Sequence, residues 1–104
     1  MDEKYLSQQL FVLTVALATK STNEDGKNKR TEACRNLMRD FYHKAEDNKQ
    51  YPYDILKKTL AGIYVEMLRD YCYLGDNPEI DTILDQVELI EDYLAEHLPY
   101  LYQD

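Results

Sequence analysis

The sequence has few cysteines and, in its second half, almost no basic residues. Cys34 and Cys72 are too few for the disulfide framework of a small secreted domain, so we expect reduced thiols in a cytoplasmic protein. Residues 61–104 hold one base, Arg69, against 11 acids, whereas residues 1–60 hold 11 Lys and Arg against 9 Asp and Glu. Nucleic acid and anionic membranes bind clustered Lys and Arg, so neither is expected as a partner.

The sequence also lacks a hydrophobic run that could span a membrane. Its most apolar stretch, LFVLTVALA at residues 10–18, is far shorter than the ~20 residues that a bilayer needs. A signal peptide would need a basic start, but residues 1–4 are net negative. The hydrophobic content of 44% argues against disorder. We therefore expect one domain over residues 1–104, with residues 10–18 in a buried helix.

Apolar residues recur with a helical period in four segments, and no segment alternates as a strand would. We expect helices over roughly residues 3–19, 31–45, 52–74 and 78–98. Thr31 is the expected cap of the second helix after a polar loop over residues 20–30. Gly75 should end the third helix, and the Asn-Pro-Glu run at residues 77–79 should start the fourth. Short connections predict a compact, antiparallel all-α bundle, onto which the C-terminal tail packs back.

The fourth helix carries what we call the acidic stripe, five acids on one face with no base among them. Its members are Asp81, Asp85, Glu88, Asp92 and Glu96. At about 100° per residue they lie within roughly 80° of one another. Like charges at this spacing repel by ~0.2–0.5 kcal/mol for each i,i+4 pair, which a merely solvated face would avoid by including Lys. The stripe therefore indicates a basic protein partner.

Leu89 and Tyr93 fall beside the stripe, away from the apolar face of the same helix. An apolar or aromatic residue ringed by charge is typical of an interface hot spot. The alternative is that the tail residues 100–102 or a second chain cover them. On the third helix, Glu66, Asp70 and Tyr73 would extend this acidic surface if the two helices are neighbours. Any single Tyr could instead serve the core, because the chain has no Trp.

Glu91 is the one acid that the helical period places within the apolar face of the fourth helix. A buried carboxylate must be paired or become neutral. We expect a structural partner such as Arg35, Arg39 or a Tyr hydroxyl, and a functional role is the lesser alternative.

Signatures of catalysis and of metal or cofactor binding are weak. Helical metal sites use Glu-x-x-His pairs, but neither His43 nor His97 has a Glu three residues before it. Arg35 and Arg39 do not have the spacing to His43 that helical RNases of the HEPN type use. Cys34 and His43 lie about 180° apart on one helix and cannot form a nucleophile–base pair. We expect neither an enzyme nor a cofactor.

These features predict a binding module that presents an acidic helix to a basic surface. The most concrete version is an inhibitor or immunity-type protein that occludes the basic groove of a nuclease or similar toxin. Colicin DNase immunity proteins use the same strategy, although none of their motifs occurs in this chain. The alternatives are a phage-type mimic of nucleic acid and a structural or regulatory homodimer that uses the apolar first helix. We favour a monomer, because a net charge of −8 opposes self-association.

Overall fold

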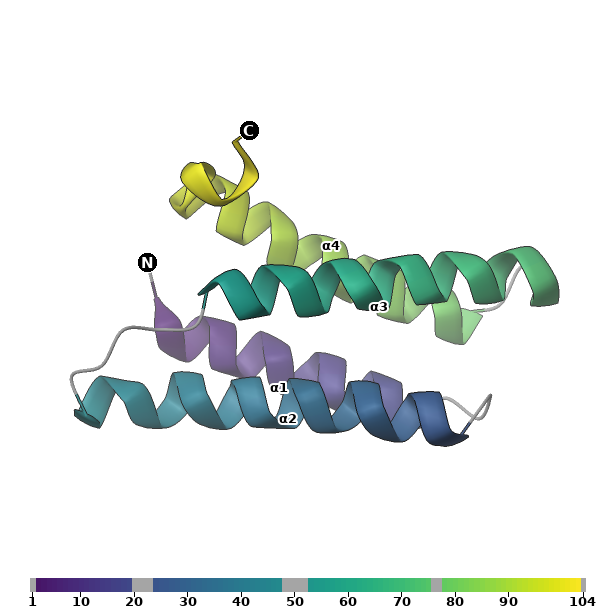
Figure 1. Cartoon of the computed structure of the whole chain (residues 1–104), viewed down its shortest axis with the longest axis horizontal. Helices are drawn as coiled ribbons and strands as arrows, with labels where there is room; N and C mark the ends of the chain where they lie inside the picture. The colour runs from purple at the N-terminus through teal and green to yellow at the C-terminus, as the bar shows by residue number, and fades with distance from the viewer. Residues whose placement is uncertain (1, 20–23, 48–52, 76–77, 104) are drawn as a thin grey trace.

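Four α-helices and a short C-terminal 3₁₀ helix make up the computed structural model, which describes residues 2–19, 24–47, 53–75 and 78–103 (Figure 1). Within these ranges, only the backbone is described for residues 3, 19, 24–28, 42–47, 70, 71, 73 and 74. The elements are α1 (Glu3–Thr19), α2 (Glu24–Asp47), α3 (Tyr53–Leu74), α4 (Pro78–His97) and the 3₁₀ helix η1 (Pro99–Tyr102). The described ranges contain no strand, so the predicted all-α class is confirmed.

The helices pair as two antiparallel hairpins, α1 with α2 and α3 with α4 (Figure 1). α1 packs along α2 and also against α4, whereas α2 and α3 meet at only a few places. The radius of gyration is 13.7 Å, close to the ~13 Å expected for a compact domain of about 100 residues. The predicted antiparallel bundle is therefore confirmed, with α4 as a partner of both α1 and α3.

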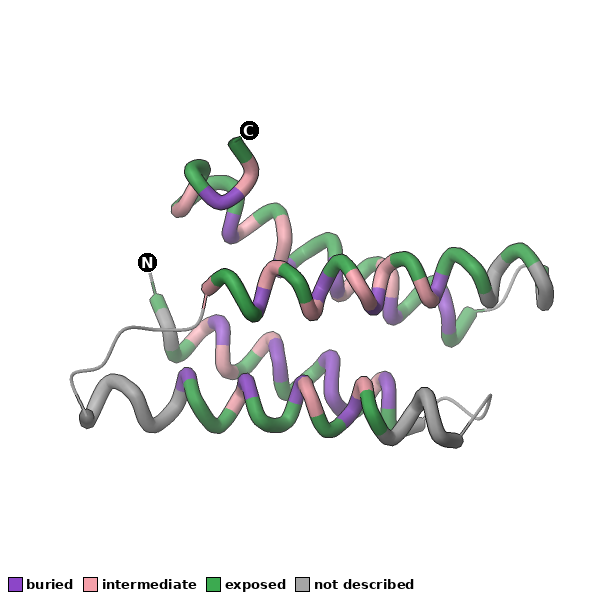
Figure 2. Tube along the Cα trace, in the orientation of Figure 1, coloured by how far each residue is buried: buried purple, intermediate pink, exposed green. Residues whose placement is uncertain are grey.

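Each α-helix buries residues along one face (Figure 2), and these residues form an apolar, mostly aliphatic core. Its buried members include Leu6, Leu10, Leu13, Leu17, Leu37, Phe41, Leu56, Leu60, Ile63, Met67, Ile80, Ile83, Val87, Ile90 and Leu94. They recur every three or four residues, as amphipathic helices require. Truncating one fully buried leucine to alanine typically costs about 2–5 kcal/mol. Rotating α4 about its axis would expose its buried residues at a comparable cost, so this face fixes the rotation of α4.

The start of α1 and the end of α3 follow local chemistry. Asp2 caps α1, since its Oδ1 accepts hydrogen bonds from the backbone N–H groups of Lys4 (3.0 Å) and Tyr5 (3.2 Å). Gly75 follows α3 with a φ of 76°, the left-handed conformation expected of a C-terminal glycine. In η1, Leu101 is buried and its carbonyl accepts a hydrogen bond from Lys57 of α3. The expectation that the tail packs back is confirmed.

The predicted start of the second helix is wrong. α2 begins at Glu24, so residues 24–30 are helical and Thr31 lies inside the helix as a buried residue. The segment has Gly26 and no apolar period, which suggested a loop. Its Glu, Lys and Arg residues are nevertheless good helix formers. Arg30 then ties this turn to α3 through an ion pair with Glu66.

α1 is not buried all round. Its leucine face contacts α2 and α4, while Phe11, Val12 and Val15 on the remaining side are 56%, 46% and 46% exposed. None of the helices in the described part of the chain is long and apolar enough to cross a membrane.

Candidate protein-binding surface

All five carboxylates of the acidic stripe are exposed along α4. The helix begins at Pro78 and contains neither Lys nor Arg. Its apolar face, from Ile80 to Leu94, is buried against α1 and α3, so the stripe on the opposite side must face outward. The side chains of Asp85, Asp92 and Glu96 form no hydrogen bond or ion pair with another described residue. The predicted exposure of the stripe is confirmed.

Each flank of the stripe is fixed to a different neighbouring helix. On the α1 side, the Gln86 amide donates hydrogen bonds to the Gln9 backbone carbonyl (3.0 Å) and to Gln9 Oε1 (2.8 Å). On the α3 side, the Tyr64 hydroxyl donates to Glu88 Oε1 at 3.4 Å. These contacts hold α4 in one rotation, so the stripe forms a ridge between the two flanks.

Leu89 and Tyr93 both lie on the α1 flank, but their surroundings differ. Leu89 is 40% exposed, next to the acids. Tyr93 is half-buried: its hydroxyl accepts a hydrogen bond from the Asp2 N–H (2.9 Å), and its ring lies 4.6 Å from that of Tyr5. The His97 ring also contacts the Tyr93 ring, with 4.4 Å between centroids. The start of α1, rather than the tail residues 100–102, therefore covers Tyr93.

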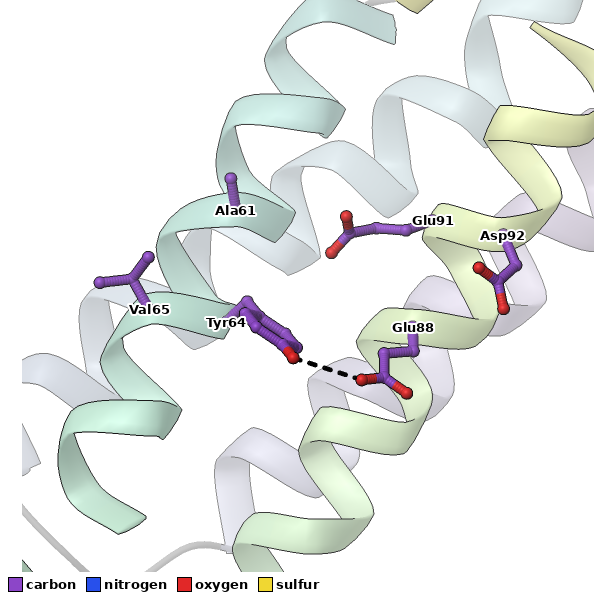
Figure 3. A pocket seen from close by; sticks show the side chains of 6 residues that line it. All are labelled: Ala61, Tyr64, Val65, Glu88, Glu91 and Asp92. Atoms are coloured by element: carbon purple, nitrogen blue, oxygen red, sulfur yellow. Dashed lines mark hydrogen bonds between the residues drawn. The ribbon is translucent and has the colours of Figure 1, made fainter. Parts of the chain in front are cut away.

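A pocket opens on the other flank, between α3 and α4 (Figure 3). We call it the α3–α4 pocket; it has a volume of about 410 Å³ and is lined by Ala61, Tyr64, Val65, Glu88, Glu91 and Asp92. The α3 wall is apolar and aromatic, whereas the α4 wall consists of three carboxylates. Tyr64 points from α3 toward Glu88, and the Glu91 side chain extends from α4 toward α3 (Figure 3). Two members of the stripe thus also belong to a concave site.

The electrostatic environment of the pocket is strongly negative. Burial raises the pKa of Glu91 above its ordinary value, and the charges of Asp92 and Glu88 raise it further. The charge of Glu88 and, to a smaller extent, desolvation and the hydrogen bond raise the pKa of the Tyr64 hydroxyl. In η1, burial raises the pKa of Tyr102, and the charges of Glu91 and Asp92 add to the rise. Every shift disfavours further negative charge in this region.

The expected structural partner of Glu91 is not found. No hydrogen bond or ion pair joins Glu91 to another described residue. Arg35 instead pairs with Glu32 on its own helix, at 3.1 Å. Glu91 is half-buried rather than buried, because it lies at the edge of the apolar face where α3 and α4 separate. Its carboxylate is directed toward the pocket (Figure 3).

The chain matches no protein-family model, no curated protein and no solved structure.

The predicted contribution of α3 to the acidic surface is only partly described. Glu66 is turned toward α2, where its Oε2 lies 2.5 Å from Arg30 Nε. On α3 it lies on a different side from Ala61, Tyr64 and Val65, which face the pocket. The side chains of Asp70 and Tyr73 lie outside the described residues. Among the described α3 side chains, Tyr64 is the one that forms a hydrogen bond with a member of the acidic stripe.

Sequence reasoning missed the α3 wall of the pocket. Ala61, Tyr64 and Val65 follow the i, i+3, i+4 spacing of one helix face, which is the signal that could have pointed to them. Among the described residues, no group of three His, Cys, Asp or Glu side chains is arranged to hold a metal ion. The pocket carboxylates accordingly line a wall and do not converge on one point.

Proposed function

We propose that this protein is a binding module that presents the acidic stripe of α4 to a basic protein surface. In its most specific form, it is an inhibitor or immunity-type protein that covers the basic substrate groove of a nuclease or similar toxin. A groove that holds phosphates must be positively charged, so an acidic ridge is its natural complement. The observation that carries the proposal is the outward exposure of five carboxylates on a helix without Lys or Arg.

The energetic cost of the acidic stripe to the folded protein supports a binding role. The stripe contains repulsive i,i+4 pairs, such as Asp81 with Asp85 and Glu88 with Asp92, each worth ~0.2–0.5 kcal/mol. Basic groups of a partner would attract these carboxylates and so offset their mutual repulsion. The same attraction would steer the partner toward the ridge at low salt.

Leu89 favours a protein partner over nucleic-acid mimicry. It is 40% exposed beside the stripe and offers an apolar contact. Interface cores combine such contacts with a charged rim, whereas a mimic of a phosphate backbone has no use for an exposed apolar residue among its acids.

Affinity capture from the source cell, at about 50 mM and about 500 mM salt, tests the proposal. We expect the wild-type chain to retain a basic protein at low salt and to inhibit its nucleic-acid binding or cleavage once that protein is purified. The double variant Asp85→Lys, Asp92→Lys should lose both effects.

Asp40→Lys is the control for a charge reversal outside α4, because Asp40 is an exposed acid on α2. It should keep capture and inhibition. Equal capture by the stripe variant and the control, or a captured protein whose activity the wild-type chain leaves unchanged, would refute the proposal.

A further inference from the structure

The α3–α4 pocket combines three features on the surface of a helix pair. It is concave, with a volume of about 410 Å³ that lies within the usual range of small-ligand sites. One wall offers the Tyr64 ring with the apolar side chains of Ala61 and Val65. The other wall offers the carboxylates of Glu88, Glu91 and Asp92 (Figure 3).

No positive side chain of the described chain lines this pocket. Lys57 lies one turn before Ala61 on α3, but its side chain interacts with η1. It donates a hydrogen bond to the Leu101 carbonyl, and its Nζ lies 4.9 Å from the centre of the Tyr102 ring. The three pocket carboxylates are therefore not neutralised from within the described chain. A cation from outside would relieve their mutual repulsion.

The shape of the site selects among cations. A compact metal ion needs several ligands at one point, and the described carboxylates form no such cluster. An arginine side chain suits the pocket better, because its planar guanidinium can stack on an aromatic ring and donate to two carboxylates at once. Its aliphatic stem can pack on the apolar wall.

We propose that the α3–α4 pocket receives an arginine side chain of the partner protein, between Tyr64 on α3 and the carboxylates of Glu88 and Glu91 on α4. This inference rests on the proposed function, since it specifies how the basic partner is anchored beside the acidic stripe. The stripe steers the partner by long-range charge, and the pocket supplies a short-range contact with a defined geometry.

The test uses N-acetyl-arginine amide as the probe and two-dimensional amide NMR of the full chain as the readout. We expect saturable shifts that are largest at Ala61, Tyr64 and Glu91. N-acetyl-citrulline amide has nearly the same shape without the charge, and it should cause no saturable shift. Shifts spread evenly along the stripe without saturation, or equal shifts with citrulline, would overturn the inference.

Two charge-matched variants sharpen the test. Glu91→Gln should weaken binding of the arginine probe about two- to fivefold, the usual effect of one exposed ion pair. Glu96→Gln removes the same charge from the same helix outside the pocket and should leave the affinity unchanged. Tyr64→Leu should weaken binding by removing the aromatic face. Equal effects of the two glutamine variants would mean that only the overall charge matters and would overturn the inference.

Failure of the arginine-pocket inference can be distinguished from failure of the proposed function. If the probe does not bind but the Asp85→Lys, Asp92→Lys variant loses its partner, the stripe acts without the pocket. If the probe binds but capture is independent of the stripe, the pocket is an arginine site on a protein whose function lies elsewhere.

Discussion

The Tyr93 hydroxyl accepts a hydrogen bond of 2.9 Å from the backbone N–H of Asp2, the residue that caps α1. The two residues are 91 positions apart, so this contact joins the beginning of the chain to its last α-helix. It fixes the α1 flank of the acidic stripe and leaves Leu89 as the more exposed of the two expected contact residues. Tyr93 therefore has a structural role that any test of partner binding must take into account.

Tyr93→Phe should lower the free energy of unfolding by about 0.5–1.5 kcal/mol, because the ring stays against Tyr5 while the acceptor for the Asp2 N–H is lost. Tyr93→Ala should cost more, since the aromatic contacts with Tyr5 and His97 disappear as well. Urea unfolding measures both values. Tyr100→Phe is the control, because Tyr100 is 60% exposed, and it should have no effect. An unchanged free energy of unfolding for Tyr93→Phe would mean that the Asp2 contact adds no stability.

Much of the fold could be predicted from local sequence chemistry. Leu6, Leu10, Leu13 and Leu17 lie on one helix face, and all of them are buried. Gly75 and Pro78 bracket the connection between α3 and α4 as their conformational preferences require. The exposure of the acidic stripe followed from the same periodicity. These features depend on a few adjacent residues, so a single sequence is enough to find them.

The missed features depend on how helices meet. The start of α1 covers Tyr93 because α1 packs on α4, and no spacing within α4 indicates that arrangement. The pocket exists because α3 and α4 leave a gap beside Tyr64 and Glu91, which depends on the angle between two helices. Thr31 was predicted to cap the second helix because the polar segment before it has no apolar period; its burial inside α2 depends on the packing of the bundle.

The two cysteines should react very differently with a thiol reagent. Cys34 is fully buried, and desolvation raises its pKa to about 12 despite the opposing charge of Arg30. Cys72 is exposed. Near pH 8, native protein should therefore lose one thiol quickly to Ellman's reagent and the second only on unfolding. A Cys72→Ser variant should be unreactive until denaturant is added; rapid modification of Cys34 in that folded variant would contradict the buried position.

We expect a monomer of 12.3 kDa by light scattering at low protein concentration, because the net charge of −8 opposes close contact between copies. Any dimer formed between the basic first half and the acidic second half should dissociate as salt is added. A dimer that resists salt would instead assign an interface to the exposed apolar side of α1. Val12→Lys would then be expected to disrupt it.

Glu91 should lower the stability of the protein at neutral pH. Its pKa in the folded state is raised above the ordinary value of 4.5, through burial and the charges of Asp92 and Glu88, so the folded state holds the proton more tightly than the unfolded state. The contribution of this tighter proton binding to the free energy of unfolding is fully present below the unfolded pKa and is lost as pH rises through the folded pKa. Tyr64 from α3 and Tyr102 from η1 face the same carboxylate and supply no positive charge.

Glu91→Gln should therefore match the wild type in urea unfolding near pH 3.5 and be more stable near pH 7. Relief of the i,i+3 repulsion with Glu88 alone should contribute ~0.2–0.5 kcal/mol. Carbon-detected NMR of the Glu91 carboxyl supplies an independent check. A midpoint at or below the ordinary value, or equal stability of the two proteins at both pH values, would contradict the raised pKa.

The acidic stripe should affect partner binding and folding in opposite directions. Glu96→Lys places a base four residues after Asp92 and near the negative end of α4, so it should raise the free energy of unfolding by about 0.3–1 kcal/mol. The same change should slow association with a basic partner, and added salt should reproduce the effect on the wild type. Leu89→Ala should instead speed dissociation and cost ~2 kcal/mol of binding if Leu89 is a hot spot. Binding kinetics at low and high salt, measured beside thermal melts, separate these effects. Unchanged kinetics for both variants in folded protein would leave the stripe as a solvated face.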